Sequence, residues 1–371
     1  MTKAKIRKMF PGNNSSVGFY SFYDEVINFP AVKVFILKGG PGTGKSTLMK
    51  KIGAVMFKRG YDLEYHYCSS DPDSLDGLVI PSGRIAVLDG TRPHVIEPKN
   101  PGVVEEIVNL GDFWDEHLLL KNKEKIMELN KRKARMFQLA YSHLREAQIV
   151  QDELESYYQE AVDPVRVRKL WQQVNEAVFR EVPPQFAQPA KVRRLFASAN
   201  TPGGYVHHLD SILQEARLLY LLQGEPGTGK EEFLESVYRW GTGRGLTCEV
   251  YHCPFQPRRM ELLYFPPLSA GFLRVEEPLK FEPGNLPELQ DCREVNFNQD
   301  LNTKILQIYQ QEIKEAKSRL FALRKKAWDK LKAAQEVHGY LERLYLPAMD
   351  FEAVNRKGEE VLQKIQSYLN S

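Results

Sequence analysis

Two short glycine-rich stretches have the residue types and the spacing that bind phosphate groups. The first, GGPGTGKS, fits the pattern G-x-x-x-x-G-K-[ST]. Its glycines let the backbone curl until the N–H groups face phosphate oxygens, and the next helix adds the positive end of its dipole. Lys45 would then reach the terminal phosphates of a nucleotide, and the Ser46 hydroxyl would bind Mg²⁺. We predict ATP contacts at Gly39, Gly40, Pro41, Gly42, Thr43, Gly44, Lys45, Ser46 and Thr47.

The second stretch, GEPGTGKE, lies 185 positions later and lacks the metal-binding hydroxyl. Glu231 stands in the place of Ser46, and its carboxylate would repel phosphate at short range. The alternative for either stretch is a glycine-rich turn with a stray lysine, but the copy at a fixed offset argues against it. Phosphate binding is still predicted at Gly224, Gly227, Thr228, Gly229 and Lys230, without a well-placed Mg²⁺.

A P-loop enzyme also needs an acidic residue at a strand end to hold Mg²⁺ through its water shell. Asp89 closes the apolar run 85–88 and is the candidate, together with Ser46, for the metal. An Asp-Gly turn that merely ends the strand is the alternative. Gly90 follows, where many ATPases place a Glu that orients the attacking water. Arg274 stands opposite Asp89 in the second copy, which we therefore predict to be structural or regulatory.

The stretch 69–76 follows the second expected strand of the first copy and is rich in acidic residues. Ligands gather at the carboxyl ends of strands in doubly wound sheets, so these side chains can position metal-bound water or an acceptor. An ordinary polar turn explains the same composition equally well. The catalytic candidates are Lys45, Asp89, Asp71 and Asp73.

The whole chain of 371 residues reads as two copies of one unit. The segment FPGNNSSVGFYSFYD (10–24) matches FASANTPGGYVHHLD (196–210), and the correspondence continues into both helical tails. We predict a first repeat over residues 10–181, a proline-rich linker over 182–195 and a second repeat over 196–371.

Strands alternate with helices in each copy, which predicts an α/β fold of two tandem P-loop NTPase units with parallel sheets, each followed by long helices. Apolar residues recur every three or four positions from Ile313 to Ala334. The first tail repeats this stripe from Ile126 to Ala147 with one exception, Lys133. A long helix that packs against the α/β core, or against its counterpart, explains the stripe.

The bulk composition favours a cytoplasmic protein. No apolar run is long enough to span a membrane, and the N-terminal residues lack the apolar core of a secretory signal. The four cysteines form no C-x-x-C pair, which suits a reducing compartment. The net charge is only +3, and the basic stretch 121–135 contains acidic residues, so we expect a solvated helix face and no nucleic-acid partner.

Four segments together resemble a known family: GGPGTGKST, YHYCSSDPDSLDGLVIP, VLDGTRPHVIEP and the later GEPGTGK. The chain resembles, over nearly its whole length, uncharacterised bacterial tandem P-loop proteins that are usually labelled ATPases or nucleotide-kinase-like proteins. That resemblance implies ATP binding without an assigned substrate. The family is expected to carry serviceable loops in both halves, and Glu231 and Arg274 depart from this in the second.

Three functions compete at this point. The leading hypothesis is Mg²⁺-dependent ATP hydrolysis in the first repeat. A small-molecule or nucleotide kinase, with its acceptor near Asp71, is the second. The third is a nucleotide-gated switch without catalysis, whose helical arms bind a partner protein.

Overall fold

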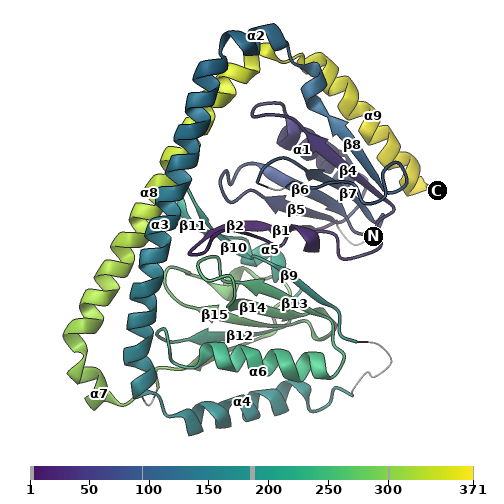
Figure 1. The fold of residues 1–371 in the computed structure, drawn as a ribbon. Helices are drawn as coiled ribbons and strands as arrows, with labels where there is room; N and C mark the ends of the chain where they lie inside the picture. The colour runs from purple at the N-terminus through teal and green to yellow at the C-terminus, as the bar shows by residue number, and fades with distance from the viewer. Residues whose placement is uncertain (1–3, 94, 184–188, 300, 371) are drawn as a thin grey trace.

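The computed structural model describes residues 4–93, 95–183, 189–299 and 301–370, so the part of the expected linker at 184–188 lies outside the described residues. Two α/β units follow one another along the chain (Figure 1). The strands of unit 1 are β1 (Ile6–Met9), β2 (Gly12–Ser15), β3 (Gly18–Ser21), β4 (Lys33–Lys38), β5 (Leu63–Tyr67), β6 (Leu75–Ile80), β7 (Ile85–Asp89) and β8 (Glu105–Asn109). Helix α1 (Lys45–Lys58) and the short helices η1 (Tyr23–Glu25) and η2 (Leu110–Phe113) complete this part.

Unit 2 repeats this order of elements. Its strands are β9 (Val192–Leu195), β10 (Ser198–Thr201), β11 (Gly204–His207), β12 (Leu218–Gln223), β13 (Cys248–His252), β14 (Met260–Phe265), β15 (Ala270–Val275) and β16 (Asp291–Asn296). Its helices are α5 (Leu209–Ile212) and α6 (Lys230–Gly243), with the short η3 (Pro266–Leu268) and η4 (Pro283–Asn285). The two main sheets have the same six-strand order, β1-β5-β6-β7-β4-β8 and β9-β13-β14-β15-β12-β16.

Both sheets are mixed, which corrects the expectation of parallel sheets. Strand β6 runs antiparallel to β5 and to β7, and β14 does the same between β13 and β15. The reason is the length of the connection: only residues 81–84 join β6 to β7, and a parallel crossover needs about a dozen residues. The remaining pairs, including β4 with β7 and β4 with β8, are parallel.

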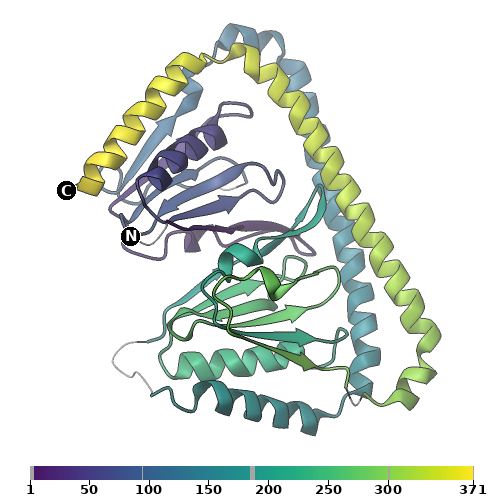
Figure 2. The ribbon, with the colours of Figure 1, turned by 180° about the vertical axis from the view of Figure 1, so that it is seen from behind.

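Two long helices lie along one side of both units. Helix α3 (Lys123–Ala161) and helix α8 (Gln310–Tyr345) lie side by side in Figures 1 and 2. They are antiparallel, because Glu153 bonds Arg319 while Glu160 bonds Tyr309. The predicted apolar stripes meet at their contact, where the buried residues include Leu144, Ala147, Ala316, Leu320 and Ala327. We call this pair the arms; α2 (Glu116–Lys121) and α7 (Thr303–Ile308) precede them.

Each unit receives its last helix from the other repeat. Helix α9 (Phe351–Asn370), at the end of repeat 2, packs on the core of unit 1 through Val354, Val361 and Ile365. Helix α4 (Pro164–Phe179), at the end of repeat 1, packs on the core of unit 2 through Val174 and Phe179. Figure 1 shows the exchange: α9 lies with α1 and β8, and α4 lies with α6. The short η5 (Leu346–Ala348) joins α8 to α9.

The units also meet directly, in a reciprocal manner. Phe10 and Phe196 exchange both backbone hydrogen bonds, at 2.9 and 3.0 Å. The buried Asn14 and Asn200 each donate a side-chain hydrogen bond to the backbone carbonyl of the other. Such reciprocal contacts are those of an isologous, two-fold interface within one chain. Among the described helices, none combines the length and the apolar character that crossing a membrane requires.

Candidate functional site

The first glycine-rich stretch forms a tight loop between β4 and α1, which we call glycine loop 1 (residues 39–46). Gly39, Gly42 and Gly44 have φ values of +151°, +69° and +86°, which other residues rarely adopt. Gly44 is also the N-cap residue that precedes α1, so the loop ends at the positive end of a helix of 14 residues. The sequence therefore builds a backbone curl whose shape depends on its glycines.

Lys45 folds back over this loop. Its Nζ donates hydrogen bonds to the carbonyl oxygens of Gly39 and Gly40, at 2.9 and 3.0 Å. The same atom lies 3.7 Å from Asp89 Oδ2, and both side chains are largely buried. The Lys45 ammonium can exchange these carbonyl partners for hydrogen bonds to the oxygen atoms of an anionic ligand.

Asp89 ends β7, and β7 is the parallel neighbour of β4, with Leu37 opposite Asp89. The carboxyl ends of both strands therefore meet at one edge, which explains why Asp89 lies beside Lys45. Asp89 Oδ1 accepts hydrogen bonds from the backbone N–H and the hydroxyl of Thr91, at 2.8 and 2.6 Å. Burial raises the pKa of Asp89, and Lys45 and Thr91 oppose that shift.

The structure brings only some of the other predicted residues to this edge. Ser46 Oγ accepts a hydrogen bond from the backbone N–H of Leu75 at 3.0 Å, which ties α1 to β6. Asp71 Oδ2 accepts from Ser74 at 2.6 Å. Asp73 is exposed, and the contact described for it uses its backbone carbonyl, which accepts from Lys50. Asp76 lies in the buried strand β6 instead of the expected loop.

Repeat 2 supplies residues to this site that the sequence reasoning did not assign. A Cβ atom at Gly42 would lie 3.5 Å from the carbonyl oxygen of Glu342, and one at Gly40 would lie 2.9 Å from the ring of Tyr345. Further back along α8, Gln335 donates to Asp71 Oδ1 at 3.3 Å. Glycine loop 1 is therefore covered by the end of the arm that belongs to the other repeat.

Three polar side chains of the arms form a cluster next to this loop. His338 Nε2 lies 3.7 Å from Glu342 Oε1, and His338 Nδ1 lies 3.4 Å from Lys133 Nζ. Burial lowers the pKa of His338 to about 4, with Lys133 acting in the same direction. Burial also lowers the pKa of Lys133, and burial and Asp71 raise the pKa of Glu342. Of these three residues, only Lys133 stood out in the sequence, because it is the charged exception in the apolar stripe of the first tail.

Glycine loop 2 (residues 224–231) has the same backbone form but a different electrostatic state. Gly224, Gly227 and Gly229 again have positive φ values, of +150°, +78° and +98°. Lys230 Nζ bonds the carbonyl oxygens of Gly224 and Glu225 and lies 3.4 Å from Glu276 Oε2. Lys230 is only 2% exposed, so it is more deeply buried than Lys45, and it lies closer to Glu276 than Lys45 lies to Asp89.

The positions of the predicted metal ligands carry a salt-bridge network in unit 2. Arg259 lies between two carboxylates: it donates a hydrogen bond to Glu155 Oε2 of α3 at 2.8 Å, and its Nε forms an ion pair with Glu231 Oε2 at 3.1 Å. Arg274 lies 3.7 Å from Glu231. Unit 1 has the Ser46 hydroxyl and the Asp89 carboxylate at these positions. Unit 2 instead has Glu231 and Arg274, whose opposite charges neutralise each other.

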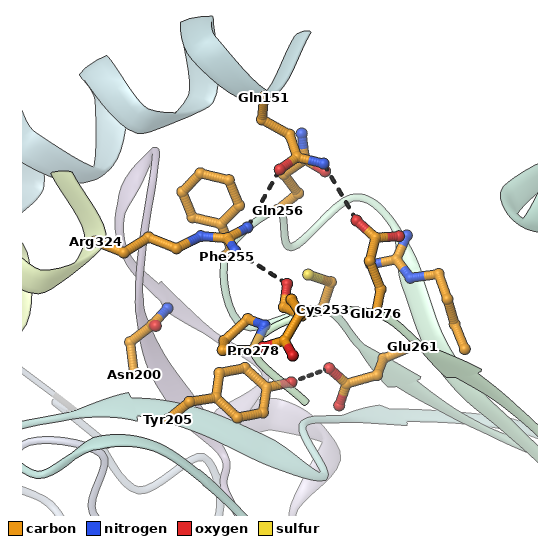
Figure 3. A pocket seen from close by; sticks show the side chains of 12 residues that line it. Gln151, Asn200, Tyr205, Cys253, Phe255, Gln256, Glu261, Glu276, Pro278 and Arg324 are labelled. Carbon is orange, nitrogen blue, oxygen red and sulfur yellow. Dashed lines mark hydrogen bonds between the residues drawn. The ribbon is translucent and has the colours of Figure 1, made fainter. Parts of the chain in front are cut away.

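A cavity of about 30 Å³ is lined by Arg274 of this network and by the residues labelled in Figure 3. Its polar walls bond one another: Arg324 donates to Gln151 at 3.2 Å and to the carbonyl oxygen of Glu277 at 3.0 Å, and Tyr205 donates to Glu261. This space suits one or two water molecules and is too small for a nucleotide.

Comparison with known proteins does not assign the chain to a family. No protein-family model, no curated protein and no solved structure matches the chain. The resemblance to tandem P-loop proteins therefore stays a prediction, while two similar α/β units with mixed sheets and long helices are what the structure shows.

Proposed function

We propose that glycine loop 1 is a P-loop that binds ATP with Mg²⁺ and that unit 1 hydrolyses the nucleotide. The observation that carries the proposal is the position of Lys45 Nζ, between the loop carbonyls and Asp89 at the ends of two adjacent parallel strands. A cation, a curl of left-handed glycines and a helix N-terminus converge there. Together they favour a ligand with several negative charges.

The residues present fit a magnesium ion held mainly by water and phosphate. Among the residues that the structure describes, no group of three or more His, Cys, Asp or Glu could hold a metal by itself. Mg²⁺ usually keeps several waters and takes one or two protein ligands with nucleotide phosphates. Ser46 would supply the hydroxyl, and Asp89 would bind a metal-bound water. The ion would neutralise negative charge on the terminal phosphates. Lys45 would then donate its hydrogen bonds to phosphate oxygens in place of the loop carbonyls.

Unit 2 has a structural or regulatory role in this proposal. Its lysine is paired with Glu276, and the Glu231–Arg259–Glu155 bridge ties glycine loop 2 to α3. A nucleotide would have to displace the buried Lys230–Glu276 pair, and leaving Glu276 alone costs about 3–5 kcal/mol. The same bridge holds the arm that continues toward unit 1.

A nucleotide-gated switch is the second candidate, and one observation favours it. Glycine loop 1 touches Glu342 and Tyr345 of α8, and Gly44 faces Phe351 and Val354 of α9. A phosphate that rearranges the loop would thereby shift the arms, which could present a surface to a partner protein.

The test of nucleotide binding is isothermal titration of the full chain with ATP, in Mg²⁺ and in EDTA. We expect Mg²⁺ to lower the Kd for ATP. Ser46→Ala should raise that Kd about tenfold in Mg²⁺ and change it little in EDTA. Ser46→Thr keeps the hydroxyl and is the matched control. No heat of binding with ATP under either condition would refute the proposal.

A further inference from the structure

We propose that Glu342 is the catalytic residue that orients the water attacking the terminal phosphate at glycine loop 1, and that Lys133 and His338 position its carboxylate. This inference rests on the proposed function and assigns the acting residue to the opposite repeat. Gly90 follows Asp89, so β7 does not supply a second carboxylate next to the metal-binding candidate. The structure instead brings one in on α8.

The position of Glu342 is the first argument. Its backbone lies against Gly42, at the middle of the loop, with the Glu342 Cα 3.6 Å from where a Cβ of Gly42 would be. Its carboxylate is half buried and experiences the charges of both Lys45 and Asp71. The side chain therefore belongs to the same electrostatic site as the lysine that would hold the phosphates.

The difference between the two loops is the second argument. Glu155 is the counterpart of Glu342 at glycine loop 2, where a Cβ at Gly227 would lie 2.5 Å from its carbonyl oxygen. Arg259 engages the Glu155 carboxylate through two nitrogens, so that group is fully occupied. Ser74 stands at the position of Arg259 in repeat 1 and bonds Asp71 instead. Among the residues that the structure describes, no guanidinium therefore pairs with Glu342 at glycine loop 1.

The contacts of the cluster supply the third argument. Lys133 Nζ lies 3.4 Å from His338 Nδ1, and an ammonium can only donate, so this contact assigns the ring proton of a neutral His338 to Nε2, which lies 3.7 Å from Glu342 Oε1. In the other arm Leu320 stands at the position of Lys133 and Gln151 at the position of His338. A half-buried lysine in an apolar helix contact costs stability, so its position beside glycine loop 1 points to a functional role.

The reaction balances with ATP and water alone. The oxygen of water bonds to the terminal phosphorus while the bond from that phosphorus to the bridging oxygen breaks, and ADP keeps the electron pair. The Glu342 carboxylate takes the proton of the attacking water and returns it to solvent. The products are ADP, phosphate and one proton.

The experiment compares Glu342→Gln, Lys133→Leu and the control Glu336→Gln, an exposed residue of the same helix, in the full chain. Glu342→Gln is expected to lower kcat for ADP release about 100-fold while the Kd for ATP changes less than about threefold. Lys133→Leu restores the apolar stripe, so we expect a higher Tm together with a kcat about tenfold lower. Glu336→Gln should match the unaltered chain.

Each other outcome overturns the inference in a recognisable way. Normal turnover by Glu342→Gln refutes the assignment and leaves the proposed function standing. A Lys133→Leu protein with lower Tm and proportionately lower ATP binding would give the cluster a structural role only. ATP binding without any turnover by the unaltered chain refutes the inference and the proposed hydrolysis but leaves nucleotide binding standing, and no ATP binding refutes the whole proposed function.

Discussion

Charged side chains at the centre of the molecule form their shortest ion pairs between the two units. Arg193 of β9 in unit 2 bonds Glu64 of β5 in unit 1 through two nitrogens, at 2.7 and 2.8 Å, and Arg7 of β1 bonds Glu249 of β13 in the reciprocal place. Burial alone would raise the pKa of Glu64, but the Arg193 guanidinium outweighs it and holds that pKa well below its ordinary value. These pairs fix how the two units face each other.

We expect Arg193→Met to destabilise the chain by about 3 kcal/mol, because it leaves the Glu64 carboxylate buried without its main partner. Urea unfolding at pH 7 measures the change. The matched control is Arg293→Met, which breaks the exposed pair with Asp291 and should cost less than about 1 kcal/mol. Equal effects of the two substitutions would contradict this account of the interface.

At the scale of residues, sequence reasoning identified groups within one repeat and missed those supplied across repeats. Lys45 and Asp89 lie together as the spacing predicted, since adjacent parallel strands place their ends side by side. Asp73 does not join them through its side chain in the contacts described. Glu342 lies about 300 positions from glycine loop 1, and no local pattern connects the two. Their roles in catalysis stay predictions.

At the scale of elements, the close contact between glycine loop 2 and α3 explains why a glycine is needed there. Gly227 has φ +78°, and an added Cβ would meet the Glu155 carbonyl oxygen at 2.5 Å. The oxygen belongs to a helix backbone, which cannot move away as a flexible side chain can. A larger residue at position 227 would therefore have a strained backbone, and its Cβ would collide with the Glu155 carbonyl oxygen.

Gly227→Ala should accordingly cost about 3 kcal/mol, the sum of backbone strain and overpacking. Gly102→Ala separates the two contributions, because Gly102 has φ +80° and nothing within 4 Å of its Cβ position. That substitution should cost only about 1 kcal/mol. Thermal unfolding of both variants measures the difference; similar losses would show that α3 does not press on the loop.

Most elements could be predicted, because their signals are local. The strand that Asp89 ends, the helix that follows glycine loop 1 and the long arms all lie close to where the sequence placed them. Strand β6 was missed, since Asp76 and the preceding polar residues resemble a loop, although Leu75–Ile80 is wholly buried. That strand makes the sheet mixed, and its direction depends on the tight turn that follows it.

At the scale of the whole molecule, the exchange of α4 and α9 makes the two repeats interdependent. One face of each sheet is buried under the unit's own helix, α1 or α6, together with a helix that the other repeat contributes. The arms and the ion pairs of Arg193 and Arg7 join the same two units. Sequence periodicity predicted the repeats, but it could not predict the exchange. A helix has the same apolar stripe whichever sheet it covers.

We expect the fragments 1–183 and 189–371 to associate tightly when they are expressed together, because α9 completes unit 1 and α4 completes unit 2. Each fragment alone exposes the apolar face of its sheet and the stripe of its arm, and should be recovered mainly as aggregate. Size-exclusion chromatography and circular dichroism decide the matter. Two fragments that fold separately and elute as independent monomers would contradict the exchange.

The central claim is that the two glycine loops have diverged, with only glycine loop 1 working on a nucleotide. ATP binding and ADP release by the unaltered chain, Lys45→Ala and Lys230→Ala, with and without Mg²⁺, test it most directly. We predict that Lys45→Ala weakens ATP binding at least about 30-fold and lowers turnover about 100-fold, while Lys230→Ala keeps most of both. A Lys230→Ala protein that is the more impaired of the two would contradict the account.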